Sequence, residues 1–175
     1  EQLLIEEHID VKGAPLSALT LSANNLQWHA EADEIKPIPD PAEAALTPKD
    51  TKTNDQLFLT GLHLEQYRHA TWSPMDYYEE ALRRDPDDYR CLNQIGLWWL
   101  RHGRFDKAEP YLHHAQRVLY KRNPNPYDGE PLYNLALCLK YQGRNHEAYE
   151  WFWKAAWSYV WRSAAVYLAA CMSMA

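Results

Sequence analysis

One pattern of apolar and small residues occurs twice between residues 92 and 155. The first copy runs Leu92, Ile95, Gly96, Trp99, Ala108, Leu112 and Ala115, and the second runs Leu132, Leu135, Ala136, Leu139, Ala148, Phe152 and Ala155. The first apolar residue of each copy and the first alanine of its expected second helix are the same distance apart, Leu92 to Ala108 (108 − 92) and Leu132 to Ala148 (148 − 132). Spacings of three and four residues place side chains on one side of a helix, and small residues let a second helix pack closely against it. The chain is therefore predicted to contain a repeated helix-turn-helix unit.

Related patterns flank these two copies. Upstream, the run is Leu57, Thr60, Gly61 and Leu64, followed by Tyr78, Ala81 and Pro86. The second helix of this upstream unit is predicted to begin at Ser73-Pro74, because serine suits the N-cap and proline suits the first turn. Downstream, the run Ala165, Leu168, Ala169 and Met172 predicts the first helix of a fourth unit that has no second helix.

The order of large and small positions resembles that of the tetratricopeptide repeat (TPR) family. The resemblance predicts an all-α array over residues 54–175, with units at about 54–88, 89–128 and 129–161 and a partial unit at 162–175. Such units stack into a right-handed α-solenoid whose first helices line a concave face. The interval from Gly96 to Ala136 (136 − 96) exceeds that from Gly61 to Gly96 (96 − 61). The excess predicts a longer second helix, through Tyr120, and an ordered loop at 122–129.

Residues 1–53 are predicted to be a short β or extended segment, comprising the end of a preceding domain and a linker. Leu3 to Val11 alternates as a strand does, Leu16 to Leu21 is a second short apolar run, and prolines stiffen residues 35–41. The strand-bearing segment and the repeats together are similar to large bacterial proteins in which a β-rich, carbohydrate-active-like domain of unknown function precedes TPR units. This resemblance implies that the chain is a fragment of such a protein and that its parent has a sugar-related context.

Composition narrows the classes of function. The chain has 175 residues, 46% of them apolar, and a formal net charge of −6, which disfavours a nucleic-acid partner. No apolar run approaches the roughly 20 residues of a membrane span, so no membrane partner is expected. Cys91, Cys138 and Cys171 lack the spacing of a metal site or a redox motif, and we expect small core side chains in a reducing, cytoplasmic compartment. No metal, cofactor or catalytic constellation is predicted.

The concave face of the expected array is the predicted binding site. Its candidate residues are Asp55, Phe58, Leu62 and Glu65 in the first unit, Asn93, Leu97, Leu100 and Arg101 in the second, and Tyr133, Leu137, Lys140 and Tyr141 in the third. Leu62, Leu97 and Leu137 are predicted to form a ladder that anchors an extended or helical peptide. Asn93, Arg101 and Lys140 are predicted to hold its backbone or a carboxylate. The alternative is that residues 1–53 or further repeats fill the groove.

A second candidate surface is a stripe of Tyr149, Trp153 and Trp157, which recur every four residues on the helix that also carries Phe152. Such a stripe is expected to be covered by the N-terminal segment, by a second copy of the chain or by a further repeat. A platform for stacking sugars and ordinary intramolecular packing are the other interpretations.

Three classes of function remain open from the sequence. The first is a non-catalytic scaffold that binds a peptide or partner protein in the groove. The second is an accessory arm of a carbohydrate-active or sugar-related protein. The third is a structural repeat that dimerises through the aromatic stripe or the incomplete C-terminal unit. TPR proteins that clamp an acidic C-terminus use Asn and basic side chains where this chain has its leucines, so a peptide with an acidic C-terminus is not expected to bind.

Overall fold

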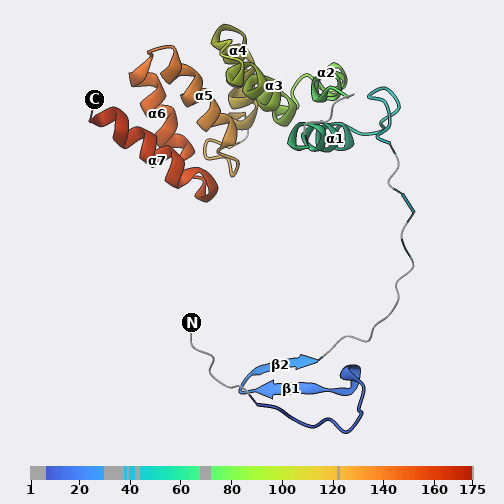
Figure 1. Cartoon of the computed structure of the whole chain (residues 1–175). Coiled ribbons are helices and arrows are strands. Elements are labelled where there is room, and N and C mark those ends of the chain that lie inside the picture. Colours follow the sequence, from blue (N-terminus) through green and yellow to red (C-terminus); the bar gives the residue numbers. More distant parts are fainter. Residues whose placement is uncertain are drawn as a thin grey trace. The chain divides into compact units, whose positions relative to one another are not determined.

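The computed structural model describes residues 7–29, 38, 40–41, 44–67, 72–121 and 123–174. Backbone contacts divide the chain into two compact units, Glu1–Glu43 and Ala44–Ala175 (Figure 1). In the described part of the chain, no helix is both long and apolar enough to span a bilayer.

The N-terminal unit contains a small antiparallel hairpin. A 3₁₀ helix, η1 (Leu16–Ala18), precedes strands β1 (Thr20–Ala23) and β2 (Leu26–His29). Thr20 pairs with His29 and Ala23 pairs with Leu26. All strand residues are exposed, so this hairpin has no buried face of its own.

The predicted strand from Leu3 to Val11 is not supported. Residues 1–6 lie outside the described part of the chain, and residues 7–11 form no strand. The run from Leu16 to Leu21 divides between η1 and β1, and β2 had no counterpart in the prediction. Alternation over so few residues is a weak signal when neither face of the segment is buried.

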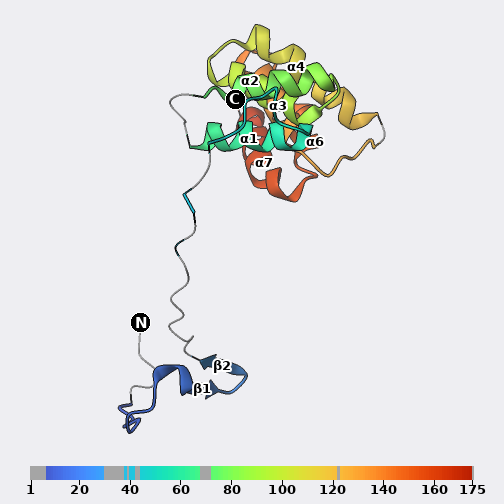
Figure 2. The same ribbon diagram turned by 90° about the vertical axis from the view of Figure 1, so that its right-hand side faces the viewer.

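The second unit is helical in the described residues. It contains seven α-helices: α1 (Asn54–Gln66), α2 (Pro74–Arg84), α3 (Tyr89–Arg101), α4 (Phe105–Tyr120), α5 (Glu130–Tyr141), α6 (Asn145–Ala155) and α7 (Tyr159–Ser173). Each helix packs against its neighbours in the chain, and α5 also contacts α3 and α7. Figure 1 shows the helices following one another in chain order, and Figure 2 shows the later helices behind α1 and α2.

The predicted helix boundaries are confirmed at several positions. Thr53 caps α1 by accepting a hydrogen bond from the Gln56 backbone N–H at 3.2 Å. Helix α2 begins at Pro74 directly after Ser73, although the Ser73 side chain makes no capping bond. Helix α4 continues to Tyr120, as the longer interval from Gly96 to Ala136 indicated.

The repeated apolar residues form the core. One buried cluster joins α1, α2 and the start of α3, and a larger one extends from α3 to α7. Two glycines mark the closest helix crossings. A Cβ atom on Gly61 would lie 2.5 Å from the Tyr78 ring, and one on Gly96 would lie 2.6 Å from the Leu112 side chain. Only glycine therefore fits these two crossings without displacement of a buried neighbour.

One predicted core residue is wrong. Cys138 and Cys171 occupy equivalent places in the repeat, and both were expected to be buried. Cys138 is buried between helices, as is Cys91, but Cys171 is exposed. Helix α7 has no described helix following it that could cover this side chain.

Residues 44–53 pack against α2. The Tyr77 hydroxyl donates to the Leu46 carbonyl at 2.8 Å. The Arg84 guanidinium donates to the carbonyls of Thr51 at 2.7 Å and Pro48 at 3.1 Å. The segment therefore groups with the helices, and the division between the units falls after Glu43, earlier than the predicted boundary after residue 53.

A buried carboxylate on α2 predicts a dependence of stability on acid pH. Glu80 is 8% exposed and accepts hydrogen bonds from Arg83 Nε at 2.8 Å and Arg84 Nε at 2.7 Å. These bonds lower the pKa of Glu80 to about 2 from an ordinary 4.5, and the bond from Arg83 contributes most. The unfolded chain therefore binds a proton more readily, and the stabilisation is lost as pH falls from about 4.5 to about 2.

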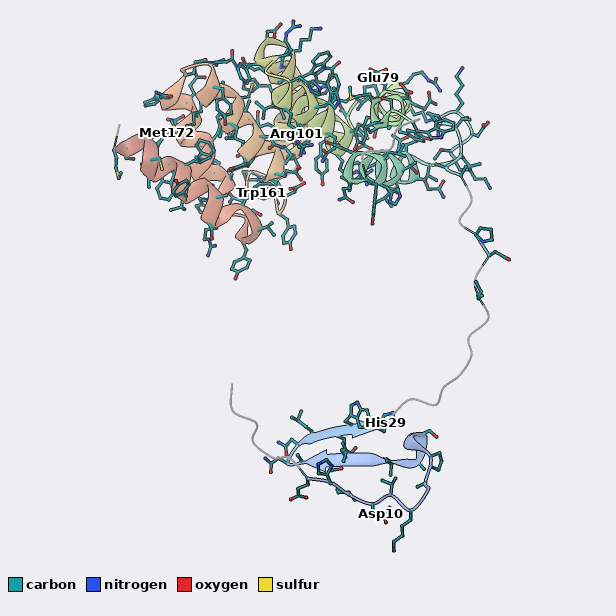
Figure 3. All side chains as sticks on the ribbon, in the orientation of Figure 1. Asp10, His29, Glu79, Arg101, Trp161 and Met172 are labelled. Carbon is teal, nitrogen blue, oxygen red and sulfur yellow. The ribbon has the colours of Figure 1, made fainter. Side chains whose placement is uncertain are left out.

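We expect Glu80→Gln to weaken the dependence of the denaturant midpoint on pH within this window. The matched control is Glu79→Gln, which removes the same charge from the exposed neighbouring residue (labelled in Figure 3). The control should follow the wild-type profile. Parallel profiles for the wild type and Glu80→Gln would contradict the prediction.

Candidate functional site

An open depression lies where α1, α3 and the start of α5 meet. It has a volume of about 600 Å³ and is lined by Phe58, Leu62, Glu65, Gln66, Gln94, Leu97, Arg101 and Glu130. Five of these residues, namely Phe58, Leu62, Glu65, Leu97 and Arg101, belong to the predicted concave face. The structure therefore brings the first and second units of the predicted groove together at one place.

The apolar part of the depression comes from α1 and α3. Phe58, Leu62 and Leu97 are half-buried, so each still offers apolar surface. The guanidinium of Arg90 lies 5.1 Å from the centre of the Phe58 ring, within the range of a cation–π contact. Arg90 also pairs with Asp55 at 2.6 Å and Asp88 at 3.0 Å.

The basic residue of the depression already has a partner. Arg101, near the end of α3 (labelled in Figure 3), forms an ion pair with Glu65 of α1. The Tyr78 hydroxyl donates to the other oxygen of Glu65 at 3.2 Å. Burial, with the nearby Glu65 carboxylate, raises the pKa of Tyr78 well above its ordinary value, so the hydroxyl remains a donor. The predicted role of Arg101 in holding a ligand carboxylate would require this pair to open.

Asn93 does not line the depression, contrary to the predicted groove set. Its side chain is 3% exposed and accepts a hydrogen bond from Asn134 Nδ2 at 2.9 Å. The bond joins α3 to α5 inside the protein. Asn93 thus acts between helices, and it is not available to hold a peptide backbone in this structure.

The groove residues predicted in the third unit do not line the depression. The Tyr133 ring packs 5.6 Å from that of Phe152 and 4.7 Å from that of Trp161, on α6 and α7. The Tyr141 ring stacks on Phe105 at 5.5 Å.

Lys140 and Leu137, which were also predicted for the groove, do not line the depression either. Lys140 Nζ lies 5.4 Å from the centre of the Tyr141 ring. Leu137 is partly buried against the larger core cluster. Of the predicted leucine ladder, only Leu62 and Leu97 line the depression described above.

Glu130 is a site residue that the sequence analysis missed. It lines the depression from the first turn of α5, and the side-chain amides of Asn93, Asn134 and Gln94 lie near its carboxylate. Burial, supported by the nearby Asp128 charge, raises the pKa of Glu130, and the amides oppose this rise. Register could have found it, because Glu130 precedes Tyr133 as Asp55 precedes Phe58 (133 − 130 and 58 − 55).

Tyr149 and Trp153 of the predicted aromatic stripe lie on the surface of α6, whereas Trp157 lies in the turn that follows, because α6 ends at Ala155. Tyr149, Trp153 and Trp157 are all exposed, and Trp157 is 71% exposed. The Tyr149 and Trp153 rings meet edge to face at 6.1 Å. Side-chain hydrogen bonding lowers the pKa of Tyr149, and Trp153 contributes more to this shift than Ser173.

A shallow depression of about 250 Å³ lies beside this stripe, between α6 and α7. It is lined by Trp153, Ala156, Trp157, Arg162 and Val166. Four further large apolar side chains at or next to α7 are also exposed, namely Tyr159, Val160, Tyr167 and Met174. We call the stripe and these neighbours the α6–α7 face.

No protein-family model matches the chain. Within the described ranges, no group of three or more His, Cys, Asp or Glu residues is placed to hold a metal ion. The two adjacent histidines of α4 have separate partners, because His113 faces Glu109 at 3.4 Å and His114 faces Asp87 at 2.9 Å. Among the described residues, the depression and the α6–α7 face are therefore the candidate sites for a partner.

Proposed function

We propose that residues 54–175 form a TPR-type right-handed solenoid and act as a non-catalytic scaffold for a peptide or partner protein. Contacts of α5 with both α3 and α7 support this architecture, because first helices of successive units lie side by side in such an array. The observation that carries the functional proposal is the shared depression. Leu62 follows Gly61, and Leu97 follows Gly96, so equivalent residues of two units line one concave site.

The depression suits an extended or helical segment more than a small rigid ligand. Its apolar residues come from two helices and share the lining with polar side chains, a combination that grooves for peptides also use. The anchors are Phe58, Leu62 and Leu97, and each keeps part of its surface for a partner. A few half-buried anchors commonly supply most of the binding free energy of such an interface.

The experiment compares Leu62→Glu with Leu59→Glu in the full chain. Leu62 lines the depression, whereas Leu59 is an exposed residue of the same helix outside it. A phage-displayed library of random dodecapeptides is selected on the wild type, and the affinities of enriched peptides are measured by fluorescence anisotropy. We expect Leu62→Glu to weaken binding more than about tenfold, since a hot-spot anchor contributes about 2 kcal/mol or more.

The control Leu59→Glu should bind as the wild type does, and circular dichroism should show that both variants are folded. A peptide with an acidic C-terminus should show no binding at micromolar concentration. The proposal fails if no peptide is enriched on the wild type, or if both variants bind equally well. An empty wild-type selection would favour a groove filled by residues 1–53.

A second candidate function, self-association, is favoured by the α6–α7 face. Several large aromatic and aliphatic side chains are exposed there, and Trp153, Trp157 and Val166 line one depression. Exposed apolar patches commonly mark contact surfaces. We expect sedimentation equilibrium to give a mass that rises toward that of a dimer with concentration. Trp157→Ser should shift this rise to higher concentration, whereas Leu59→Glu should not. A constant monomer mass for the wild type would exclude this candidate.

A further inference from the structure

The charges in the depression between α1, α3 and α5 are not balanced. Its lining carries three ionisable side chains: Glu65, Arg101 and Glu130. Glu65 and Arg101 form an ion pair with each other. Among the described residues, no Lys, Arg or His lies in ion-pair distance of Glu130. Among the described residues, Glu130 is therefore the one ionisable side chain of this lining without an ion-pair partner.

Neutral side chains adjoin the Glu130 carboxylate. They are the amides of Asn93 and Gln94 on α3 and of Asn134 on α5. Asn134 also donates to Asn93 at 2.9 Å, so the amides form a connected network between the two helices. Amide donors orient a carboxylate without neutralising it, and partial burial makes the remaining charge unfavourable. A cation at this position would relieve that cost.

Nearby charges favour the same class of ligand. The Asp128 carboxylate adds negative charge close to Glu130. The Arg90 guanidinium, which lies 5.1 Å from the centre of the Phe58 ring, is shared by Asp55 and Asp88. Arg90 and Arg101 thus both have acidic partners, so an anionic ligand would find neither cation free.

We propose that the depression selects a peptide segment with a Lys or Arg side chain, whose cationic group pairs with the Glu130 carboxylate. The inference rests on the proposed peptide-binding function and adds its specificity. Phe58, Leu62 and Leu97 provide apolar surface for the stem of that side chain or for an adjacent apolar residue. Lys and Arg suit such a site because their aliphatic stems pack on apolar surface while the charged end reaches a polar partner.

The first test reads the sequences of the peptides selected from the dodecapeptide library on the wild-type full chain. We expect Lys or Arg to be enriched at one position, next to apolar residues, and Asp and Glu to be depleted. Enriched peptides that depend on Leu62 but show no preference for Lys or Arg would overturn this inference and leave the proposed function intact. A selection with no dependence on Leu62 would overturn both.

The second test assigns the preference to Glu130. An enriched peptide with Lys and the same peptide with norleucine are compared on the wild type, Glu130→Gln and Glu150→Gln. Glu150 is an exposed residue of α6 outside the depression, so its variant controls for the change in net charge. We expect the Lys peptide to bind about tenfold more tightly to the wild type, as for a hydrogen bond to a charged group.

Glu130→Gln should remove most of that tenfold difference, and Glu150→Gln should keep it. A preference that survives in Glu130→Gln, or that both variants lose equally, would overturn the assignment. A further measurement uses only the wild type, so its result does not depend on whether Glu130→Gln folds. The side-chain amide resonances of Gln94 and Asn134 should shift on binding of the Lys peptide and shift less with the norleucine peptide. Equal shifts would also contradict the assignment.

Discussion

Replacing Phe152 with alanine is expected to lower the free energy of unfolding by about 3–5 kcal/mol. Phe152 is 0% exposed and belongs to the larger core cluster, where its ring lies 5.6 Å from that of Tyr133. The substitution removes a full aromatic ring from between α5, α6 and α7, and close-packed surroundings collapse only partly into the space. Denaturant titration followed by circular dichroism measures the effect.

The neighbouring aromatic residue provides the control for this prediction. Trp153 is 45% exposed and lies on the α6–α7 face, so Trp153→Ala leaves no closed cavity. We expect this variant to lose less than about 1 kcal/mol. Equal losses for the two variants would mean that the α6 register is wrong, or that the α6–α7 face is buried in an oligomer. The self-association experiment separates these two explanations.

Replacing Gly96 with leucine is expected to lower the free energy of unfolding by about 3 kcal/mol, at the upper end of the range for overpacking. A Cβ atom at this position would already lie 2.6 Å from Leu112 Cγ. Leu112 is completely buried and cannot move into solvent. The remaining atoms of the new side chain would force α3 and α4 apart. The midpoint of urea unfolding measures the loss.

A double-mutant cycle tests whether this particular contact causes the loss. Leu112→Ala alone should cost about 2–5 kcal/mol through the cavity that it leaves. Together with Gly96→Leu, it should cost less than the two single losses added, because the new leucine partly fills the cavity. Additive losses would show that the α3–α4 crossing is not where the structure places it. Ala170→Leu, on the exposed side of α7, is the control and should have little effect.

Within the predicted groove, the positions closest to the repeated glycines were the most reliable. Leu62 and Leu97 directly follow Gly61 and Gly96, and both line the depression. Leu137 follows Ala136 in the same register and, like Leu97, packs against the larger core cluster, but it does not line the depression. Register indicates the side of a helix on which a residue lies. It does not indicate which other helices cover that side, because this depends on how neighbouring units are stacked.

The hydrogen-bond and ion-pair partners of the polar side chains were harder to predict from the sequence. Asn93 and Arg101 were expected to face a ligand, yet Asn93 bonds to Asn134 and Arg101 pairs with Glu65. These partners are far apart in the chain, since Asn134 lies 41 positions after Asn93 and Arg101 lies 36 positions after Glu65. No local spacing rule connects residues so far apart. The same limitation concealed Glu130, whose neighbouring amides include residues of a different helix.

The sequence by itself determined the helices and their buried sides, because apolar spacing, caps and turn glycines act within a few residues of each other. It also indicated the two close crossings at Gly61 and Gly96, since small residues at equivalent positions are a local pattern. The tertiary structure alone decided which polar groups satisfy each other and which carboxylate lacks a cationic partner. Those outcomes depend on the three-dimensional packing of α1, α3 and α5, which sets the distances between charges and the water that remains around them.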